Sequence, residues 1–135
     1  MKKIPIVNDI KEVLKPQFDD EQGSLNVIEF KYLPFNPKRI FWINKANCPR
    51  GNHAHYKTKH IYFCVHGKIN ITITDVTITS LSYELSNDSN GIYVPNMLWN
   101  SIQFSADSSL LVLANTNYDP KDYINSWSIF CRIRK

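Results

Sequence analysis

The sequence predicts a single all-β domain of jelly-roll type, an antiparallel barrel or sandwich with one or two short helices. Three observations predict this fold. Short runs rich in Ile, Val, Tyr, Phe and Thr recur at fairly even spacing along the 135 residues. Gly, Pro and Asn clusters separate the runs as turns do. The sequence contains no internal repeat, low-complexity segment or Gly/Ser linker, so residues 1–135 are expected to form one domain.

The clearest strand is expected at residues 68–74. There Ile69, Ile71 and Ile73 alternate with Asn and Thr, which predicts one face toward the core and one away from it. His66, just before Gly67, is interpreted as a turn residue. The remaining predicted strands are residues 25–30, 39–44, 60–65, 76–81, 91–94, 101–104 and 110–114.

Helix is expected at two places only. Residues 9–15 precede Pro16 and predict a short helical turn. At residues 119–122, Asp119 resembles an N-cap that is followed by Pro120 at the first helical position.

The composition bounds the class of protein. With 43% hydrophobic residues, the chain can bury one core. Its three cysteines, Cys48, Cys64 and Cys131, form no C-x-x-C pair, which argues against a zinc site or a disulfide framework. The start of the sequence lacks an apolar leader, and no apolar run approaches the ~20 residues of a membrane helix. We expect a reduced, cytoplasmic protein without a membrane partner.

Charge is distributed unevenly along the chain. The net charge is only +4, yet residues 30–74 contain no Asp or Glu and hold all four histidines. Such a field favours an anionic partner, and a small phosphorylated ligand would suffice. Nucleic acid is the alternative, but no helix-turn-helix pattern accompanies the basic stretch, so none is expected. The basic residues of this stretch are Lys31, Lys38, Arg39, Lys45, Arg50, Lys57, Lys59 and Lys68.

The most informative segment is residues 49–60, which reads PRGNHAHYKTKH. In an extended strand His53 and His55 would project to the same side, roughly 7 Å apart. Gly51 would let the backbone turn or approach a ligand closely. Two imidazoles on one face predict either a pair of metal ligands or an acid/base pair.

This segment resembles the first motif of the cupin superfamily, a glycine, then H-x-H, three residues and a glutamate. Metal-binding cupins add a histidine from a second motif, which here resembles residues 91–100. In this chain Lys59 occupies the glutamate position and Asn100 the histidine position. An ammonium and an amide make a poor divalent site, so neither a metal nor another cofactor is expected. His60 is interpreted as an ordinary pocket or core histidine.

Within the cupins, the chain is similar to the sugar-nucleotide 3,4-ketoisomerases over about residues 23–130. The resemblance implies a jelly roll, a homodimer in which the N-terminal segment and C-terminal tail are candidates for exchange, and no metal. It also implies conversion of dTDP-4-keto-6-deoxyglucose into its 3-keto isomer, for 3-amino-3,6-dideoxy sugars such as those of cell-surface polysaccharides. The motifs that carry it are Gly23-Ser24-Leu25, Leu33-Pro34-Phe35, Lys38-Arg39-Ile40, residues 49–55, Tyr93-Val94, Trp99, Tyr118-Asp119 and Asp122-Tyr123-Ile124.

For such a reaction His53 and His55 are the candidate proton-transfer groups, because the ordinary imidazole pKa near 6.5 suits removal of a proton beside a ketone. Which of them abstracts and which delivers is left open. Arg50 and Lys59 would stabilise the negative charge of an enediolate. Arg50 and Arg39 are the candidates to bind a diphosphate, with an ion pair as the alternative for Arg39.

Five further residues are candidates for substrate contacts. Trp42 and Trp99 would stack on a thymine base, or else belong to the core. Tyr118 would close the site or anchor a short helix, as would Asp122 and Tyr123 of the same C-terminal pattern. Gln22 and Asn100 stand at positions that vary among relatives, and they would line the sugar pocket and affect the C4 configuration, whose outcome is left open.

Three other functions compete with isomerisation. A sugar-nucleotide 3,5-epimerase would act on the same keto-sugar but would invert carbon centres. A non-enzymatic cupin would bind a nucleotide sugar or another anion without turnover. A metal-dependent dioxygenase would require a bound metal.

Overall fold

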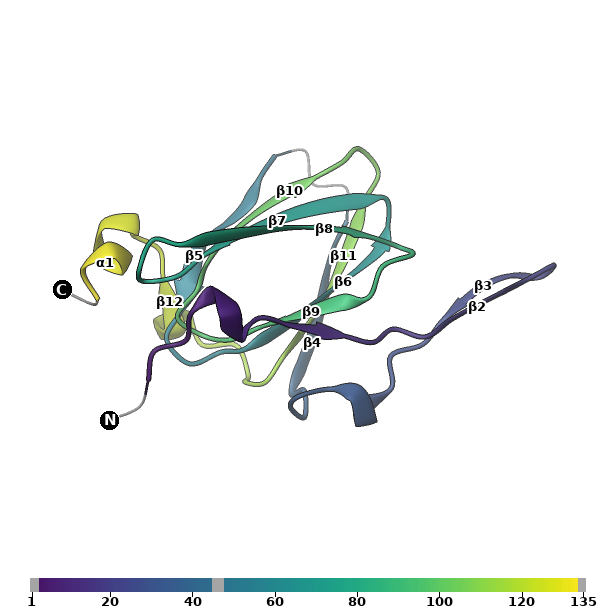
Figure 1. Cartoon of the computed structure of the whole chain (residues 1–135), viewed down its shortest axis with the longest axis horizontal. Helices are drawn as coiled ribbons and strands as arrows, with labels where there is room; N and C mark the ends of the chain where they lie inside the picture. The colour runs from purple at the N-terminus through teal and green to yellow at the C-terminus, as the bar shows by residue number, and fades with distance from the viewer. Residues whose placement is uncertain (1–2, 45–47, 134–135) are drawn as a thin grey trace.

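Two five-stranded antiparallel sheets face each other and enclose the core (Figure 1). The computed structural model describes residues 3–44 and 48–133. Neighbouring strands come from distant parts of the chain, as they do in a jelly roll, so the predicted fold class is confirmed. The first sheet has the order β1 (Lys11–Val13), β9 (Gly91–Val94), β6 (His60–His66), β11 (Ser109–Ala114), β4 (Arg39–Asn44). The second has the order β12 (Tyr123–Ile124), β5 (Arg50–His55), β10 (Trp99–Phe104), β7 (Lys68–Thr74), β8 (Ser80–Ser86).

A two-stranded hairpin projects from one end of the sandwich, and the α-helix lies at the opposite end (Figure 1). The hairpin is formed by β2 (Gln17–Asp20) and β3 (Gly23–Asn26), and the helix is α1 (Trp127–Arg132). The sequence did not predict β2 or α1. Three 3₁₀ turns complete the structure, η1 (Val7–Asp9), η2 (Phe30–Tyr32) and η3 (Pro120–Asp122).

The core lies between the two sheets. Ile69, Ile71 and Ile73 of β7 are fully buried, as their alternation with polar residues predicts. Burying one such side chain stabilises a fold by about 1.5–3 kcal/mol, so this strand anchors the second sheet. The predicted bounds of β4, β7 and β9 are confirmed, and those of β6, β10 and β11 differ by one or two residues.

The strand predicted at residues 76–81 is wrong over its first half. Asp75 is buried, and its carboxylate accepts hydrogen bonds from the backbone amides of Thr77 (2.9 Å) and Thr79 (3.2 Å). This side chain gives the backbone a turn in place of a strand ladder, and β8 therefore begins only at Ser80.

The strand predicted at residues 25–30 is also wrong beyond Asn26, where β3 ends. The chain then crosses the outer face of the first sheet, where Ile28, Leu33 and Phe35 pack against a buried cluster that includes Phe63. Regular alternation would turn some of these side chains to solvent, so packing favours an irregular segment with the turn η2.

The helical turn predicted at residues 9–15 does not form. Instead, β1 pairs with β9, with Lys11 opposite Tyr93. An isolated helix of seven residues is marginal in water, and the sheet hydrogen bonds outweigh it here. The predicted cap at Asp119 is confirmed, because its side chain accepts a hydrogen bond from the Lys121 amide and Pro120 opens η3.

Candidate active site

Strand β5 holds both histidines of the H-x-H segment on one side. The ring centroids of His53 and His55 lie 4.9 Å apart, and the rings meet edge to face. Gly51 begins the segment with φ of +86°, a left-handed conformation that suits glycine. There β5 shifts register against β10. The two imidazoles project together, as their spacing predicts.

The two histidines line a cavity of about 190 Å³ between the sheets. His60 enters from β6 in the opposite sheet, and its ring centroid lies 4.6 Å from that of His55. The prediction of His60 as a pocket histidine is therefore confirmed. The other residues that line the cavity are Phe41, Ile43, Arg50, Gly51, Tyr62, Ile102, Leu110, Val112 and Tyr123.

His55 is buried against a carboxylate. Its Nδ1 lies 3.0 Å from Oδ2 of Asp122, and the two residues are 4% and 8% exposed. The short strand β12 brings Asp122 to this place, because Tyr123 pairs with His55 in the ladder between β12 and β5.

His53 contacts a backbone carbonyl instead. Its Nδ1 lies 3.0 Å from the oxygen of Gly51. A carbonyl and a carboxylate can only accept hydrogen bonds, so each imidazole carries its proton on Nδ1 when neutral. The Nε2 atom of each ring then carries the lone pair that could accept a proton.

Burial keeps the imidazoles neutral. Burial lowers the pKa of His55 to about 4, and the neighbouring His53 adds to this effect while Asp122 opposes it. Burial also lowers the pKa of His53, and lowers that of His60 well below the ordinary value. Neutral imidazole is the form that can act as a base, so the cavity holds bases near neutral pH.

Positive charge lies beside the cavity. The Arg39 guanidinium carbon lies 5.4 Å from the Phe41 ring centroid and 5.7 Å from that of Tyr118. The Nε atom of Arg39 is buried without a hydrogen-bond partner in the described chain. Of the predicted binding residues, Arg50 lines the cavity, and Arg39 lies close enough to lower the pKa of His55.

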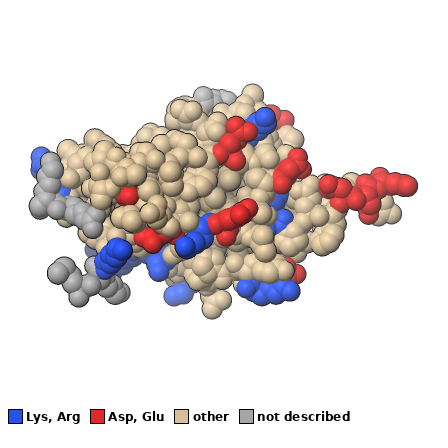
Figure 2. All heavy atoms as spheres, in the orientation of Figure 1, with Lys and Arg blue, Asp and Glu red and all other residues tan. Residues whose placement is uncertain are grey.

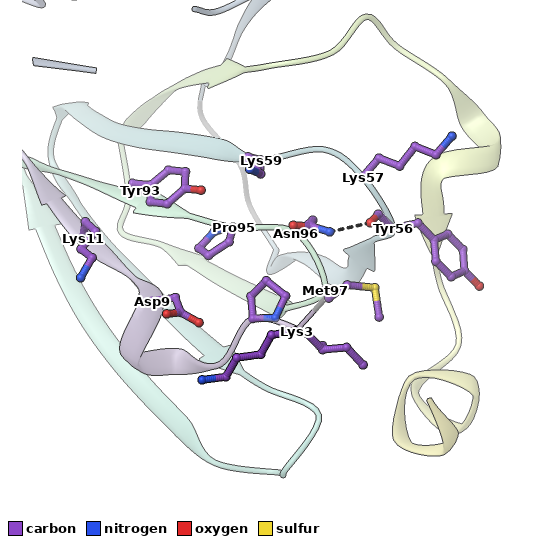
Figure 3. A pocket seen from close by; sticks show the side chains of 12 residues that line it. Lys3, Asp9, Lys11, Tyr56, Lys57, Lys59, Tyr93, Pro95, Asn96 and Met97 are labelled. Atoms are coloured by element: carbon purple, nitrogen blue, oxygen red, sulfur yellow. Dashed lines mark hydrogen bonds between the residues drawn. The ribbon is translucent and has the colours of Figure 1, made fainter. Parts of the chain in front are cut away.

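Lys59 faces away from the histidines. It lines a separate groove of about 870 Å³, which shares no lining residue with the histidine cavity. Figure 3 shows this groove, with Lys3 and Asp9 along one side and Lys57 on another. Of the basic residues in the acid-free stretch, Lys45 lies outside the described residues.

Four other predicted binding residues also lie outside the cavity within one chain. Asn100 is buried behind it, where its Oδ1 accepts a hydrogen bond from Tyr62 (3.3 Å). Trp99 packs against Trp127, with ring centroids 5.2 Å apart. Trp42 is 64% exposed on the outer side of β4, and Gln22 lies in the turn of the projecting hairpin.

Tyr62 was not among the predicted site residues, and Asp122 and Tyr123 were predicted only to close the site or anchor a short helix. The signal for two of them was present in Asp122-Tyr123-Ile124, which matches the C-terminal motif of the resembled family. Tyr123 packs against the pair at a tilt, with its ring centroid 4.4 Å from that of His55. In the described ranges, no three His, Cys, Asp or Glu side chains are placed to hold a metal ion. No described helix is long and apolar enough to span a membrane.

Comparison with known proteins identifies the family. The family model described as "FdtA: WxcM-like, C-terminal" matches residues 8–135. A TDP-4-oxo-6-deoxy-α-D-glucose-3,4-oxoisomerase from Aneurinibacillus thermoaerophilus is 36% identical over 115 residues, which cover 82% of each chain.

Two solved structures share the fold over nearly the whole chain. The TDP-fucose-3,4-ketoisomerase WlaRA from Campylobacter jejuni is 32% identical, with a TM-score of 0.83 over 94% of this chain and 96% of its own. A histidine-to-asparagine mutant of the 3,4-ketoisomerase QdtA from Thermoanaerobacterium thermosaccharolyticum, in complex with TDP-4-keto-6-deoxyglucose, is 26% identical. Its TM-score is 0.86 over 93% of this chain and 94% of its own. The chain therefore belongs to the FdtA/WxcM-like family of dTDP-sugar 3,4-ketoisomerases.

Proposed function

We propose that the protein converts dTDP-4-keto-6-deoxyglucose into a dTDP-3-keto-6-deoxyhexose. The observation that carries this proposal is the pair of neutral imidazoles, His53 and His55, 4.9 Å apart in a buried cavity beside two arginines. The relative from Aneurinibacillus supports the reaction, and the QdtA complex supports the substrate.

The reaction moves a carbonyl from C4 to C3 without net oxidation. One histidine takes the C3 proton, and the electron pair of that C–H bond forms the C3–C4 double bond as O4 becomes an oxyanion. The O3 hydroxyl then passes its proton to O4, which moves the negative charge to O3, and a proton delivered to C4 completes the reaction as the C3 carbonyl forms. Adjacent carbons need two proton-transfer groups close together, which His53 and His55 provide.

The surrounding charge suits this intermediate and its nucleotide. Arg50 lies on the cavity wall, where a guanidinium would stabilise an enediolate oxygen. The cavity of about 190 Å³ is smaller than a site for a drug-sized ligand, so we place only the sugar inside it. The diphosphate would then lie at the mouth, where the guanidinium charge of Arg39, which acts on the nearby His55, would attract it.

Proton NMR of the sugar after incubation with chelator-treated protein tests the proposal. A 3-keto product should accumulate, and the coupling at C4 reports whether the new hydroxyl is gluco or galacto. Inversion at C3 and C5 with the ketone still at C4 would indicate an epimerase. Binding of the nucleotide sugar without product would indicate a binding protein, and dependence on added metal would indicate a metalloenzyme.

Replacement of the histidines tests the assignment of the site. His53→Asn and His55→Asn should each reduce turnover by at least about 100-fold, because general acid–base catalysis contributes that much or more. The matched control is His66→Asn, which alters the exposed histidine that precedes Gly67 and should leave turnover unchanged. Wild-type turnover in both cavity variants would contradict the assignment.

We also propose that the protein works as a homodimer through the projecting hairpin. Phe18 and Leu25 face each other across it, and both are more than 60% exposed. Ile40 and Trp42 of the edge strand β4 are likewise exposed. Figure 2 shows acidic side chains gathered on the hairpin, which complements the basic residues near the cavity.

In such a dimer, Gln22 in the hairpin turn would reach the sugar pocket of the partner subunit. Sedimentation of the wild type should give a dimer, and Phe18→Ser with Leu25→Ser should shift it toward monomer. Ile78→Ser is the control, because Ile78 is 54% exposed elsewhere on the surface. A monomeric wild type would refute the dimer.

We place the enzyme in the cytoplasm, since its three cysteines are free in the structure, as a reducing compartment would keep them.

A further inference from the structure

Asp122, which contacts His55 beside the cavity, accepts four hydrogen bonds. Its Oδ1 accepts from the Lys57 amide (2.7 Å), and its Oδ2 accepts from the Thr58 amide (3.3 Å) and from His55 (3.0 Å). The Thr58 hydroxyl also donates to Oδ2. Both oxygens of this buried carboxylate are therefore satisfied, and one of the four donors is the imidazole of His55.

The network extends one step further from the cavity. The hydroxyls of Thr58 and Thr116 lie 2.7 Å apart. Because the Thr58 hydroxyl donates its hydrogen bond to Asp122, it accepts the hydrogen bond that the Thr116 hydroxyl donates. A chain of directed hydrogen bonds thus runs from Thr116 through Thr58 and Asp122 to His55.

We propose that Asp122 is a positioning residue that fixes His55 as the Nδ1–H tautomer and makes it the ring that takes up the substrate proton. This proposal rests on the proposed function for its catalytic part. With Nδ1–H held by Asp122, the lone pair of His55 lies on Nε2, and this residue lines the cavity. The ring cannot turn over without breaking a buried hydrogen bond.

The same contact distinguishes the two histidines. When His55 accepts a proton it becomes an imidazolium, whose positive charge lies against the Asp122 carboxylate. His53 would have only the Gly51 carbonyl to support the same charge. A carboxylate stabilises a cation more than a neutral carbonyl does, so this contact favours proton uptake at His55 and offsets part of the burial that lowers its pKa.

The ionisation state of Asp122 agrees with this role. Burial raises its pKa, but the hydrogen bonds from Thr58, from the Lys57 amide and from His55 outweigh burial and leave that pKa below its ordinary value. The carboxylate is therefore ionised wherever His55 is neutral. The other titratable or charged groups that act on or contact His55 are His53, His60, Arg39 and Tyr123.

Asp122→Asn removes the charge while it keeps the shape. An amide has one oxygen, so its NH₂ must face either the Lys57 amide or the Nδ1 of His55. We expect the variant to lose the single Nδ1–H tautomer of His55. Its kcat should fall at least about 100-fold with KM little changed, because a base acts in the transition state and not in binding. The acid limb of kcat/KM should also move to lower pH, since Asp122 raises the pKa of His55.

The matched control is Asp119→Asn. It makes the same change three residues away on an exposed side chain that caps the same turn without contacting His55. This variant should keep the wild-type tautomer, kcat and pH profile. Thr58→Val removes the hydroxyl that donates to Asp122 but keeps the carboxylate. Its kcat should lie between those of the wild type and Asp122→Asn, whereas Thr58→Ser, which keeps a hydroxyl, should have nearly wild-type kcat.

Nitrogen-15 NMR of the histidine rings in the free wild-type protein gives the most direct test. An Nδ1–H tautomer at His55 supports the proposal, and an Nε2–H tautomer overturns it even if Asp122→Asn fails to fold. Wild-type kcat and tautomer in folded Asp122→Asn would also overturn it. If the wild type does not isomerise the keto-sugar, the proposed function fails, and the tautomer still decides whether Asp122 positions His55.

Discussion

A Cβ atom placed on Gly51 would lie 2.9 Å from the carbonyl oxygen of Asn100, and Gly51 has φ of +86°. The glycine thus lets β5 approach β10 closely just before the two histidines. Gly51→Ala should destabilise the fold by about 1–3 kcal/mol and should displace the histidine pair. Urea unfolding measures the loss. Gly23→Ala is the control, because Gly23 also has positive φ but has no atom within 4 Å of the added Cβ. Equal losses in both variants would mean that the contact with Asn100 contributes nothing.

The two tryptophans that the sequence offered as base-stacking groups should behave differently. Trp99 contacts Trp127 and Phe130, so Trp99→Ala should lower the free energy of unfolding by about 2–4 kcal/mol. Trp42 is 64% exposed, and Trp42→Ala should change the free energy of unfolding of a dilute monomer by less than about 0.5 kcal/mol. Chemical denaturation measures both. If Trp99→Ala were as stable as the wild type but bound TDP more weakly, Trp99 would instead be a nucleotide-binding residue.

The buried imidazoles of His55 and His60 should make the fold sensitive to acid. The folded pKa of His55 is lowered from 6.5 to about 4, so the unfolded chain binds a proton first as the pH falls through this range. This residue alone should cost about 3 kcal/mol of stability between pH 7 and pH 4, and His60 acts in the same direction. The pKa of Asp122 is lowered too, so its own contribution is lost only at still lower pH. Denaturation midpoints at pH 7, 6 and 5 measure the effect, and constant midpoints would contradict it.

How far the sequence predicts the structure depends on the range of the contacts. Local alternation predicted β7 and the shared side of His53 and His55, because both depend on neighbours in one strand. The same alternation on β4 already places Arg39 and Trp42 on opposite faces, so only one of them could face the cavity of its own chain.

Long-range contacts were not predictable from pattern. Asp122 stands 67 residues from His55, and the two-residue strand β12 that joins them is too short to show any periodicity. His60 reaches the pair only because the two sheets face each other. Asp75 gave a turn where β-branched residues predicted a strand, since a side-chain hydrogen bond competes with the ladder.

Arg39 should contribute to nucleotide affinity through its charge and its unpaired Nε. Arg39→Met should weaken TDP binding by about 10- to 100-fold, the value of a charged hydrogen bond. Arg39→Lys should lose less, because it keeps the charge but not the planar fork. Titration calorimetry measures the dissociation constants. An unchanged affinity of Arg39→Met for TDP would mean that Arg39 only packs against Phe41 and Tyr118 and does not bind the nucleotide.

The central claim is that His55, supported by Asp122, removes the proton from C3 of the bound keto-sugar. The most direct test follows exchange of the C3 and C5 protons of dTDP-4-keto-6-deoxyglucose in deuterated water by NMR. The wild type should exchange C3 alone as the 3-keto isomer forms, and His55→Asn should bind the substrate without exchange. Undiminished C3 exchange in His55→Asn, or exchange at C5 in the wild type, would contradict the claim.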